Sequence, residues 1–154
     1  MKAIITMLLA LVSITGQAQT KDSLQLFVQA GDSCMQQYNT FEALKYYQEA
    51  YAIAKPRSQY CTVQMKLANC HYKRGNYRET ADLLKLVPED SLSHEAFRQL
   101  CFSYQKQGDN DSFIYWASQM VYIYPMDGEV VANLILANIK AQQPQGGIIH
   151  GLRP

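Results

Sequence analysis

The spacing of hydrophobic residues predicts a chain built from helices. Apolar and small residues recur at steps of three and four, which gathers them on one helix face, and no stretch shows the alternation typical of a half-buried strand. The expected helices cover residues 24–37, 41–54, 58 to the Gly75 turn, 77–86, 94 to the Gly108 turn, 112–124 and 128–141. Residues 146–154 are expected to begin an eighth helix.

Turn and breaker residues divide these helices into pairs. We expect Thr40 and Ser93 to be N-caps, since hydroxyl side chains accept hydrogen bonds from the first free backbone N–H groups of a helix. We expect Gly75 to adopt the left-handed conformation that ends a helix. The stop signals between pairs are Pro56, Pro88 and Pro125.

The pairs repeat at a nearly constant interval. Leu67 and Leu100 lie 33 residues apart, Leu100 and Leu134 lie 34 apart, and Gly75 and Gly108 lie 33 apart. A helix–turn–helix unit of this length resembles the tetratricopeptide repeat.

Further positions carry the same resemblance. The Leu-Gly pair of the motif is matched by Ala30-Gly31, Leu67-Ala68, Leu100-Cys101 and Leu134-Ile135, and the following aromatic residue by Tyr72 and Tyr104. The return-helix pattern is matched by Ala43, Tyr47, Ala50 and Pro56, and more loosely by Phe113, Ala117, Met120 and Pro125. Three departures are visible: Gln64 at the Trp-like position, a longer first unit, and a second return helix cut short at Pro88.

The resemblance implies an all-α fold, with helix–turn–helix repeats stacked as a right-handed α-solenoid. About three full tetratricopeptide-like repeats are expected, at residues 24–57, 58–92 and 93–127, with a partial fourth at 128–154. The physical reason is that one hairpin cannot bury its apolar stripe alone, whereas stacked neighbours bury it together.

Residues 1–18 have the layout of a secretory signal peptide. Lys2 gives a basic tip, residues 3–14 are apolar, and small residues precede the expected cleavage after Ala18. The alternative is a membrane anchor, but a span needs roughly 20 apolar residues. Residues 19–154 are then the repeat domain, exported to the periplasm or secreted, as in similar Gram-negative proteins.

Net charge bears on the expected partners, and cysteine content bears on the expected disulfides. The net charge of +1 falls to about zero without residues 1–18, which gives no electrostatic reason to expect nucleic acid or an anionic membrane. We expect the cysteines to be buried small hydrophobes, and the alternative is a disulfide between adjacent helices, with Cys70 and Cys101 the best pair. The four cysteines are Cys34, Cys61, Cys70 and Cys101.

In tetratricopeptide arrays the first helices of successive units line a concave groove that takes an extended peptide or a helix. Matching the register places a candidate peptide-groove set on two first helices. In that set, Asn69 and the nearby cations could grip a carboxylate. The alternative is an ordinary solvated face. The set is Met65, Asn69, Tyr72, Lys73, Arg98, Phe102 and Lys106.

No catalytic or metal-binding pattern is apparent in the sequence. His71, His94 and His150 are far apart, and none has a neighbour at metal-ligand spacing. Cys70 and His71 are adjacent, but neighbouring helical residues point about 100° apart. We therefore expect no enzyme, no cofactor and no metal.

These features together predict an exported helical-repeat scaffold that binds a protein or peptide through its concave groove. The alternative is the N-terminal part of a larger exported sensor, regulator or receptor, because the sequence stops inside the expected eighth helix. An uncapped end of this kind predicts self-association.

Overall fold

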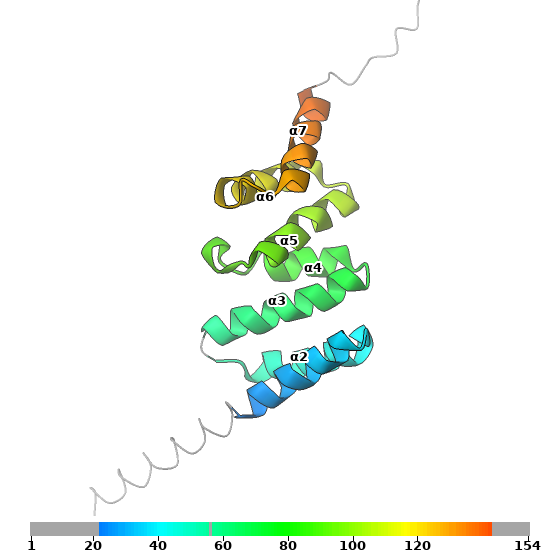
Figure 1. Ribbon diagram of the computed structural model, residues 1–154, viewed down its shortest axis with the longest axis vertical. Helices are drawn as coiled ribbons and strands as arrows, with labels where there is room; N and C mark the ends of the chain where they lie inside the picture. The colour runs from blue at the N-terminus through cyan, green and yellow to red at the C-terminus, as the bar shows by residue number, and fades with distance from the viewer. Residues whose placement is uncertain (1–21, 56, 143–154) are drawn as a thin grey trace, which may run out of the picture. The chain divides into compact units, whose positions relative to one another are not determined.

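The computed structural model describes residues 22–55 and 57–142, and within these ranges every regular element is a helix (Figure 1). An N-terminal helix spans residues 22–36. It is followed by α2 (Thr40–Ile53), α3 (Arg57–Lys73), α4 (Tyr77–Leu84), a short 3₁₀ turn η1 (Glu89–Ser91), α5 (His94–Gln107), α6 (Asn110–Ile123) and α7 (Gly128–Gln142).

The described helices match those expected from hydrophobic spacing, with ends shifted by one or two residues. The signal-peptide prediction and the expected eighth helix lie outside the described residues. By its contacts the chain divides into two compact units, Met1–Leu92 and Ser93–Pro154, which are described separately below.

The three helix–turn–helix turns share one backbone geometry. At each turn one N–H bonds back five residues, from Asn39 to Cys34 at 2.9 Å, Asn76 to His71 at 2.9 Å and Asp109 to Tyr104 at 3.0 Å. This closure needs a left-handed residue just before the donor. Gly75 and Gly108 supply it with φ of 77° and 76°, as expected for Gly75, whereas the first turn uses Tyr38 at φ 58°.

Tyr38 is a costly residue for that position, because a side chain in the left-handed region clashes with its own backbone. Its side chain buries almost nothing, since 92% of the residue is exposed. Tyr38→Gly should therefore raise the free energy of unfolding by about 0.5–1 kcal/mol, after the extra freedom of glycine in the unfolded chain is subtracted. Urea unfolding measures this.

Gly75→Ala is the matched control for that prediction. It places a side chain at the same backbone position, with nothing within 4 Å for the new methyl to contact, so it should destabilise by about 1 kcal/mol. If Tyr38→Gly and Gly75→Ala both raised the free energy of unfolding, or both lowered it, the strain explanation would be contradicted.

Of the two N-caps predicted from the sequence, one is observed and the other is not. Ser93 caps α5, and its Oγ accepts a hydrogen bond from the Ala96 N–H at 3.2 Å, as expected. The expectation for Thr40 was wrong: Asn39 is the cap, with its Oδ1 accepting from the Glu42 N–H at 3.2 Å. An amide at this position reaches the same donor and moves the helix start one residue earlier.

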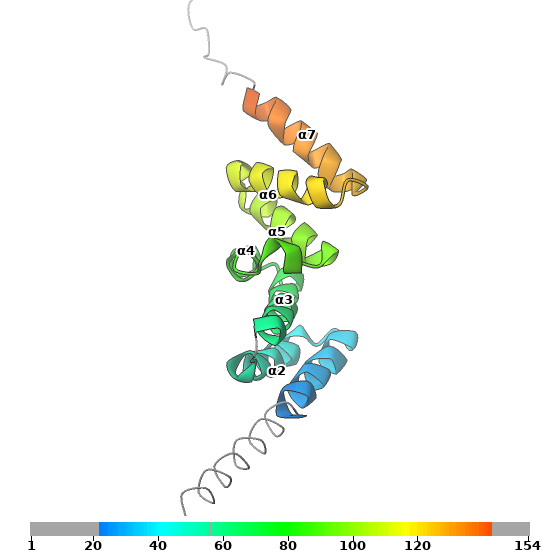
Figure 2. The same ribbon diagram turned by 90° about the vertical axis from the view of Figure 1, so that its left-hand side faces the viewer.

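In the first unit the N-terminal helix, α2, α3 and α4 pack as successive hairpins (Figures 1 and 2). Gly31 allows the closest approach, because a β-carbon there would lie 2.4 Å from the Tyr47 ring. Tyr47 is buried with Ala43, Leu67 and Cys70 in one apolar cluster. Gly31, which matches the Gly of the repeat motif, therefore permits close packing of the N-terminal helix on α2.

Two departures from the repeat pattern turn out to be linked. Gln64 is 1% exposed, and its Nε2 donates a hydrogen bond to the backbone oxygen of Leu83 at 2.7 Å. Leu83 lies in the last turn of the short helix α4, where its oxygen also accepts a long hydrogen bond of 3.4 Å from the Leu86 N–H. The buried amide at position 64 thus adds a second, shorter hydrogen bond at the end of a helix that stops early, which an apolar side chain could not do.

All four cysteines lie in the described ranges and all are free thiols, so the alternative of a Cys70–Cys101 disulfide is not formed. Cys61, Cys70 and Cys101 are buried and Cys34 is half-buried. Burial raises the pKa of the Cys70 thiol to about 11 and the pKa of the Cys101 thiol to about 12. At neutral pH these groups are protonated small hydrophobes.

In the second unit α5 packs on α6, and α6 packs on α7. Phe97 is fully buried and meets the edge of Trp116 with ring centroids 6.0 Å apart. Val130 is buried on α7, whereas three large apolar residues of the same helix are about half exposed. These are Ile135, Leu136 and Ile139.

Candidate functional site

The predicted groove residues on α3 share one helix face, since they recur at steps of three and four. Met65 and Asn69 are half-buried, and Lys73 is exposed at the end of the helix. The half-buried Tyr72 ring meets Tyr77 edge-on, with centroids 5.6 Å apart. This face therefore presents an amide, an aromatic ring and a cation.

The predicted groove residues on α5 also share a face, at a regular spacing of four. Arg98 is half-buried, Phe102 is 8% exposed and Lys106 is exposed. The Arg98 guanidinium carbon lies 5.3 Å from the centre of the Phe102 ring, within cation–π range. The α3 and α5 sets belong to different units, so each stands on its own helix.

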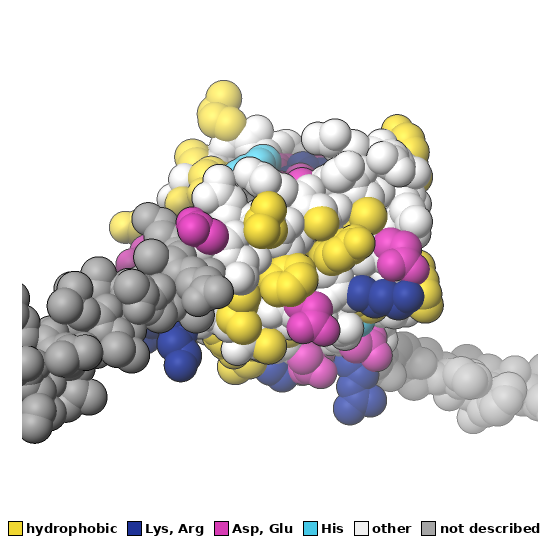
Figure 3. Space-filling model, turned by 90° about the horizontal axis from the view of Figure 1, so that it is seen from below, with side chains coloured by type: hydrophobic (Ala, Val, Ile, Leu, Met, Phe, Trp, Pro, Cys, Tyr) yellow, Lys and Arg dark blue, Asp and Glu magenta, His cyan; other side chains and the backbone are white. Residues whose placement is uncertain are grey.

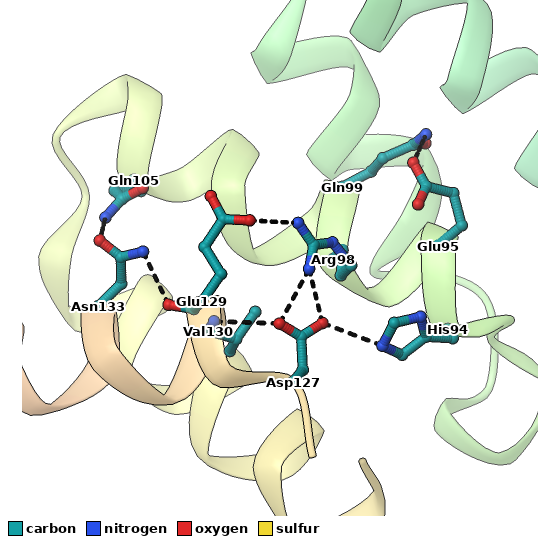
Figure 4. Close-up of polar contacts among 9 residues, drawn as sticks. All are labelled: His94, Glu95, Arg98, Gln99, Gln105, Asp127, Glu129, Val130 and Asn133. Atoms are coloured by element: carbon teal, nitrogen blue, oxygen red, sulfur yellow. Dashed lines mark hydrogen bonds and ion pairs between the residues drawn. The ribbon is translucent and has the colours of Figure 1, made fainter. Parts of the chain in front are cut away.

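Arg98 is also the centre of an ion-pair cluster that sequence reasoning missed (Figure 4). Its Nη1 donates to both carboxylate oxygens of Asp127, at 2.9 and 2.8 Å, and its Nη2 donates to Glu129 at 2.5 Å. His94 Nε2 lies 3.0 Å from Asp127 Oδ2. The cluster joins the start of α5 to the start of α7.

The Asp127 carboxylate also caps the N-terminus of α7. Its Oδ1 accepts a hydrogen bond from the Val130 N–H at 3.2 Å, three residues into the following helix. An Asp directly before a helix start is a cap signal that the sequence carried. The contact with Arg98 spans 29 residues and leaves no local pattern, so only the structure reveals it.

The pKa values follow from this geometry. Burial alone would raise the pKa of Asp127, whose side chain is 2% exposed, but the hydrogen bonds from Arg98 and from the Val130 N–H, with the Arg98 charge, hold it below its ordinary value. The hydrogen bonds to Asp127 and Glu129 raise the pKa of Arg98. Both groups are charged at neutral pH, and each satisfies the other.

A cleft of about 610 Å³ opens beside this cluster. Its polar side holds His94 and Glu129, and the His94 ring meets Tyr124 edge-on with centroids 4.8 Å apart. No Ser, Thr or Cys side chain is among the described residues that line it, and the hydroxyl among them belongs to Tyr124. The lining residues are His94, Arg98, Ile123, Tyr124, Pro125, Met126, Asp127, Gly128 and Glu129.

Each unit also ties one first helix to the next through polar side chains. In the first unit Asp32 of the N-terminal helix accepts from Lys66 of α3 at 2.6 Å, and from the Tyr47 hydroxyl at 2.5 Å. In the second unit Gln105 of α5 donates to Asn133 of α7 at 3.0 Å, alongside the Arg98 contacts. These links fix the spacing of first helices within each unit.

Residues 22–55 and 57–142 contain neither a metal-binding group nor a membrane-spanning helix. No group of three or more His, Cys, Asp or Glu side chains there is arranged to hold a metal ion. No helix in those ranges is both long enough and apolar enough to cross a bilayer.

Comparison with known proteins identifies the fold. No family model matches the chain, and no curated protein sequence matches it. Among solved structures, the tetratricopeptide-containing domain of a putative FK506-binding protein from Plasmodium falciparum is similar at a TM-score of 0.63 and 14% identity, over 79% of this chain and 90% of that one.

A second similar structure is the TPR2AB domain of yeast Sti1 in complex with pHSP90. It matches at a TM-score of 0.59 and 16% identity over 79% of this chain, which spans about half (48%) of the Sti1 chain. These likenesses show that the chain has the tetratricopeptide fold, an all-α stack of helix–turn–helix repeats, as its sequence predicts.

Proposed function

We propose that the chain is a helical-repeat scaffold that binds a protein or peptide along the faces of its first helices. The observation that carries this proposal is the tetratricopeptide fold, since the similar Sti1 structure is a complex with pHSP90. On α3 this face carries Asn69, Tyr72 and the exposed Lys73, and on α5 it carries the exposed Lys106 beside the mostly buried Phe102.

The chemistry of these faces suits a peptide with a carboxylate. Lys73 and Lys106 are exposed, and no ion pair engages either of them within the part of the chain that the structure describes. Arg98 is different, because Asp127 and Glu129 already occupy its guanidinium. It supports the face by holding Phe102 and α7, and helices that are already ordered lose little entropy on binding.

Co-purification of crosslinked partners tests this proposal. Lys73→Glu combined with Lys106→Glu reverses two exposed charges on these faces and should abolish recovery of the partner. Arg98→Glu is unsuitable, because it would break the contacts to Asp127. Lys55→Glu combined with Arg57→Glu makes the same charge change at the start of α3 and should leave recovery unchanged. Equal loss in both double variants would argue against the first-helix faces.

We further propose that the protein is bacterial and exported, with residues 1–18 removed. The support is the basic, apolar and small-residue order of that stretch. N-terminal sequencing of the protein purified from its native cells should begin at Gln19. A chain that keeps Met1 in the cytoplasm would contradict the proposal.

The alternative, that the chain forms the N-terminal part of a larger sensor, regulator or receptor, has one observation in its favour. Ile135, Leu136 and Ile139 leave an apolar strip on α7 that further repeats or a second copy would cover. Light scattering on residues 19–154 should then show concentration-dependent association that Leu136→Glu removes. A monomer at high concentration would speak against association through this apolar strip.

A further inference from the structure

An exposed aromatic ring on the first unit lies between two cations. Phe41, in the first turn of α2, is 58% exposed. The Lys45 Nζ lies 4.6 Å from the centre of its ring, and the Arg74 guanidinium carbon lies 5.7 Å from it. Arg74 belongs to the turn between α3 and α4, so two neighbouring hairpin turns meet at this ring.

Tyr38 adds a second exposed ring at the same edge. It occupies the left-handed turn position that the other two hairpins give to glycine. Its side chain is almost fully exposed, so contacts within the chain do not compensate for that conformation. Strained residues that pack against nothing recur at binding sites, where another molecule supplies the contact.

The charges at this edge are predominantly positive. Residues 37–46 and 71–79 contain two acids, Glu42 and Glu79, against four basic side chains. Glu42 is already paired with Lys45 at 2.9 Å, whereas Arg74 has no carboxylate partner among the described residues. The basic side chains are Lys45, Lys73, Arg74 and Arg78.

Hydrophobic, basic and acidic side chains also mix on the face seen in Figure 3, which looks at the first unit from below. Hydrophobic groups gather over the middle of that face, and charged groups border them. The large exposed apolar residues of the N-terminal helix and α2 are Leu26, Phe41 and Tyr46.

We infer that an aromatic–basic edge, made of Tyr38, Phe41, Lys45 and Arg74, binds an acidic segment of a partner protein that carries aromatic or aliphatic side chains. Arg74 would receive a carboxylate in two parallel hydrogen bonds, and the two rings would cover the apolar side chains. None of these four residues belongs to the first-helix faces, although the edge adjoins the α3 face at Lys73.

A protein segment fits this edge better than a nucleic acid or a membrane. Duplex DNA and anionic bilayers are usually held by several unpaired cations in a row, each releasing counterions. Here acids offset two of the four cations, and the exposed rings contribute apolar area. A mixed surface of this kind is typical of a protein interface, in which aromatic residues and arginine are enriched.

Fluorescence anisotropy with synthetic peptides tests the inference. The probe is a short fluorescein-labelled peptide in which Glu alternates with Trp, and the control peptide has Lys in place of each Glu. The Glu peptide should bind and the Lys peptide should not. Arg74→Glu should raise the Kd of the Glu peptide about tenfold, and Tyr38→Gly should raise it about threefold.

Further controls keep the outcome decisive. Lys55→Glu reverses an exposed charge outside both proposed surfaces and should leave the Kd unchanged. A loss of affinity in Lys106→Glu but not in Arg74→Glu would place the peptide on the first-helix faces and overturn the inference, so the two proposals remain distinguishable. Circular-dichroism melting of Tyr38→Gly should show a midpoint no lower than that of the wild type, which excludes unfolding as the cause of weaker binding. Unchanged affinity in both edge variants would overturn the inference. Tighter binding to a single-stranded oligonucleotide or to phosphatidylserine vesicles than to the Glu peptide would overturn it as well.

Discussion

Asp127→Ala is expected to lower the free energy of unfolding by about 2–3 kcal/mol, because it leaves the buried Val130 N–H and the partly buried Arg98 guanidinium without this acceptor. The variant removes the acceptor for Arg98, for His94 and for the Val130 N–H together. Breaking a buried pair can cost about 3–5 kcal/mol, but Arg98 is 27% exposed and keeps Glu129, so the lower value applies. Urea unfolding measures the change.

Two related variants separate the parts of this effect. Asp127→Asn keeps an oxygen that can accept from the Val130 N–H, but it removes the charge and replaces the second accepting oxygen by an NH2 donor, so it should lose about half as much as Asp127→Ala. Glu129→Ala removes an exposed partner and should change stability by less than about 0.5 kcal/mol. Equal losses in the three variants would contradict the central position given to Asp127.

The same carboxylate predicts how stability depends on pH. The pKa of Asp127 lies below its ordinary value in the folded protein, so its stabilisation is complete above about pH 4 and is lost as the pH falls further. Asp127→Asn should therefore flatten the stability profile of the purified protein below about pH 4. An identical profile in the variant and the wild type would show that Asp127 does not titrate as described.

Leu100→Ala is expected to cost about 2–5 kcal/mol, since the deleted atoms leave a cavity in a packed site. Leu100 is fully buried on α5 beside Phe97 and Cys101, which are also fully buried. Ile135→Ala is the matched control, because Ile135 is 55% exposed on α7 and should change stability by less than about 0.5 kcal/mol. Circular-dichroism melting compares them, and an unchanged midpoint for Leu100→Ala would contradict its assignment to the core.

The sequence predicted the features that depend on local pattern. Helix positions follow from hydrophobic spacing, and Gly75 takes a positive φ because the turn closure requires one. Gly31 occupies the Gly position of the repeat motif, and it lies against the Tyr47 ring. Each of these depends on residues close in sequence or on a repeat interval that the sequence displays.

Features set by long-range contacts or by competing local choices could not be predicted in the same way. Asn39 and Thr40 are both good caps, and only the backbone geometry selects Asn39. Tyr38 fills a glycine position without any pattern to announce it. Gln64 looked like a defect in the repeat until its hydrogen bond to the end of α4 was seen.

The candidate site also combines features that local sequence pattern predicts with features that depend on long-range contacts. The face carrying Asn69, Tyr72 and Lys73 follows from helical periodicity alone. Whether a cation on such a face is available to a ligand depends on its tertiary partners. Arg98 and Lys106 look alike in the sequence, but Asp127 and Glu129 engage Arg98, whereas Lys106 is exposed.

Site-specific photocrosslinking in native cells tests most directly whether the first-helix faces bind a partner. Benzoylphenylalanine placed at Tyr72 on α3, or at Lys106 on α5, should crosslink to one and the same partner protein. The same group at Tyr122 on α6, where the side chain is 88% exposed, should give no adduct with that partner. Adducts at Tyr122 with none at Tyr72 and Lys106 would contradict binding through the first helices.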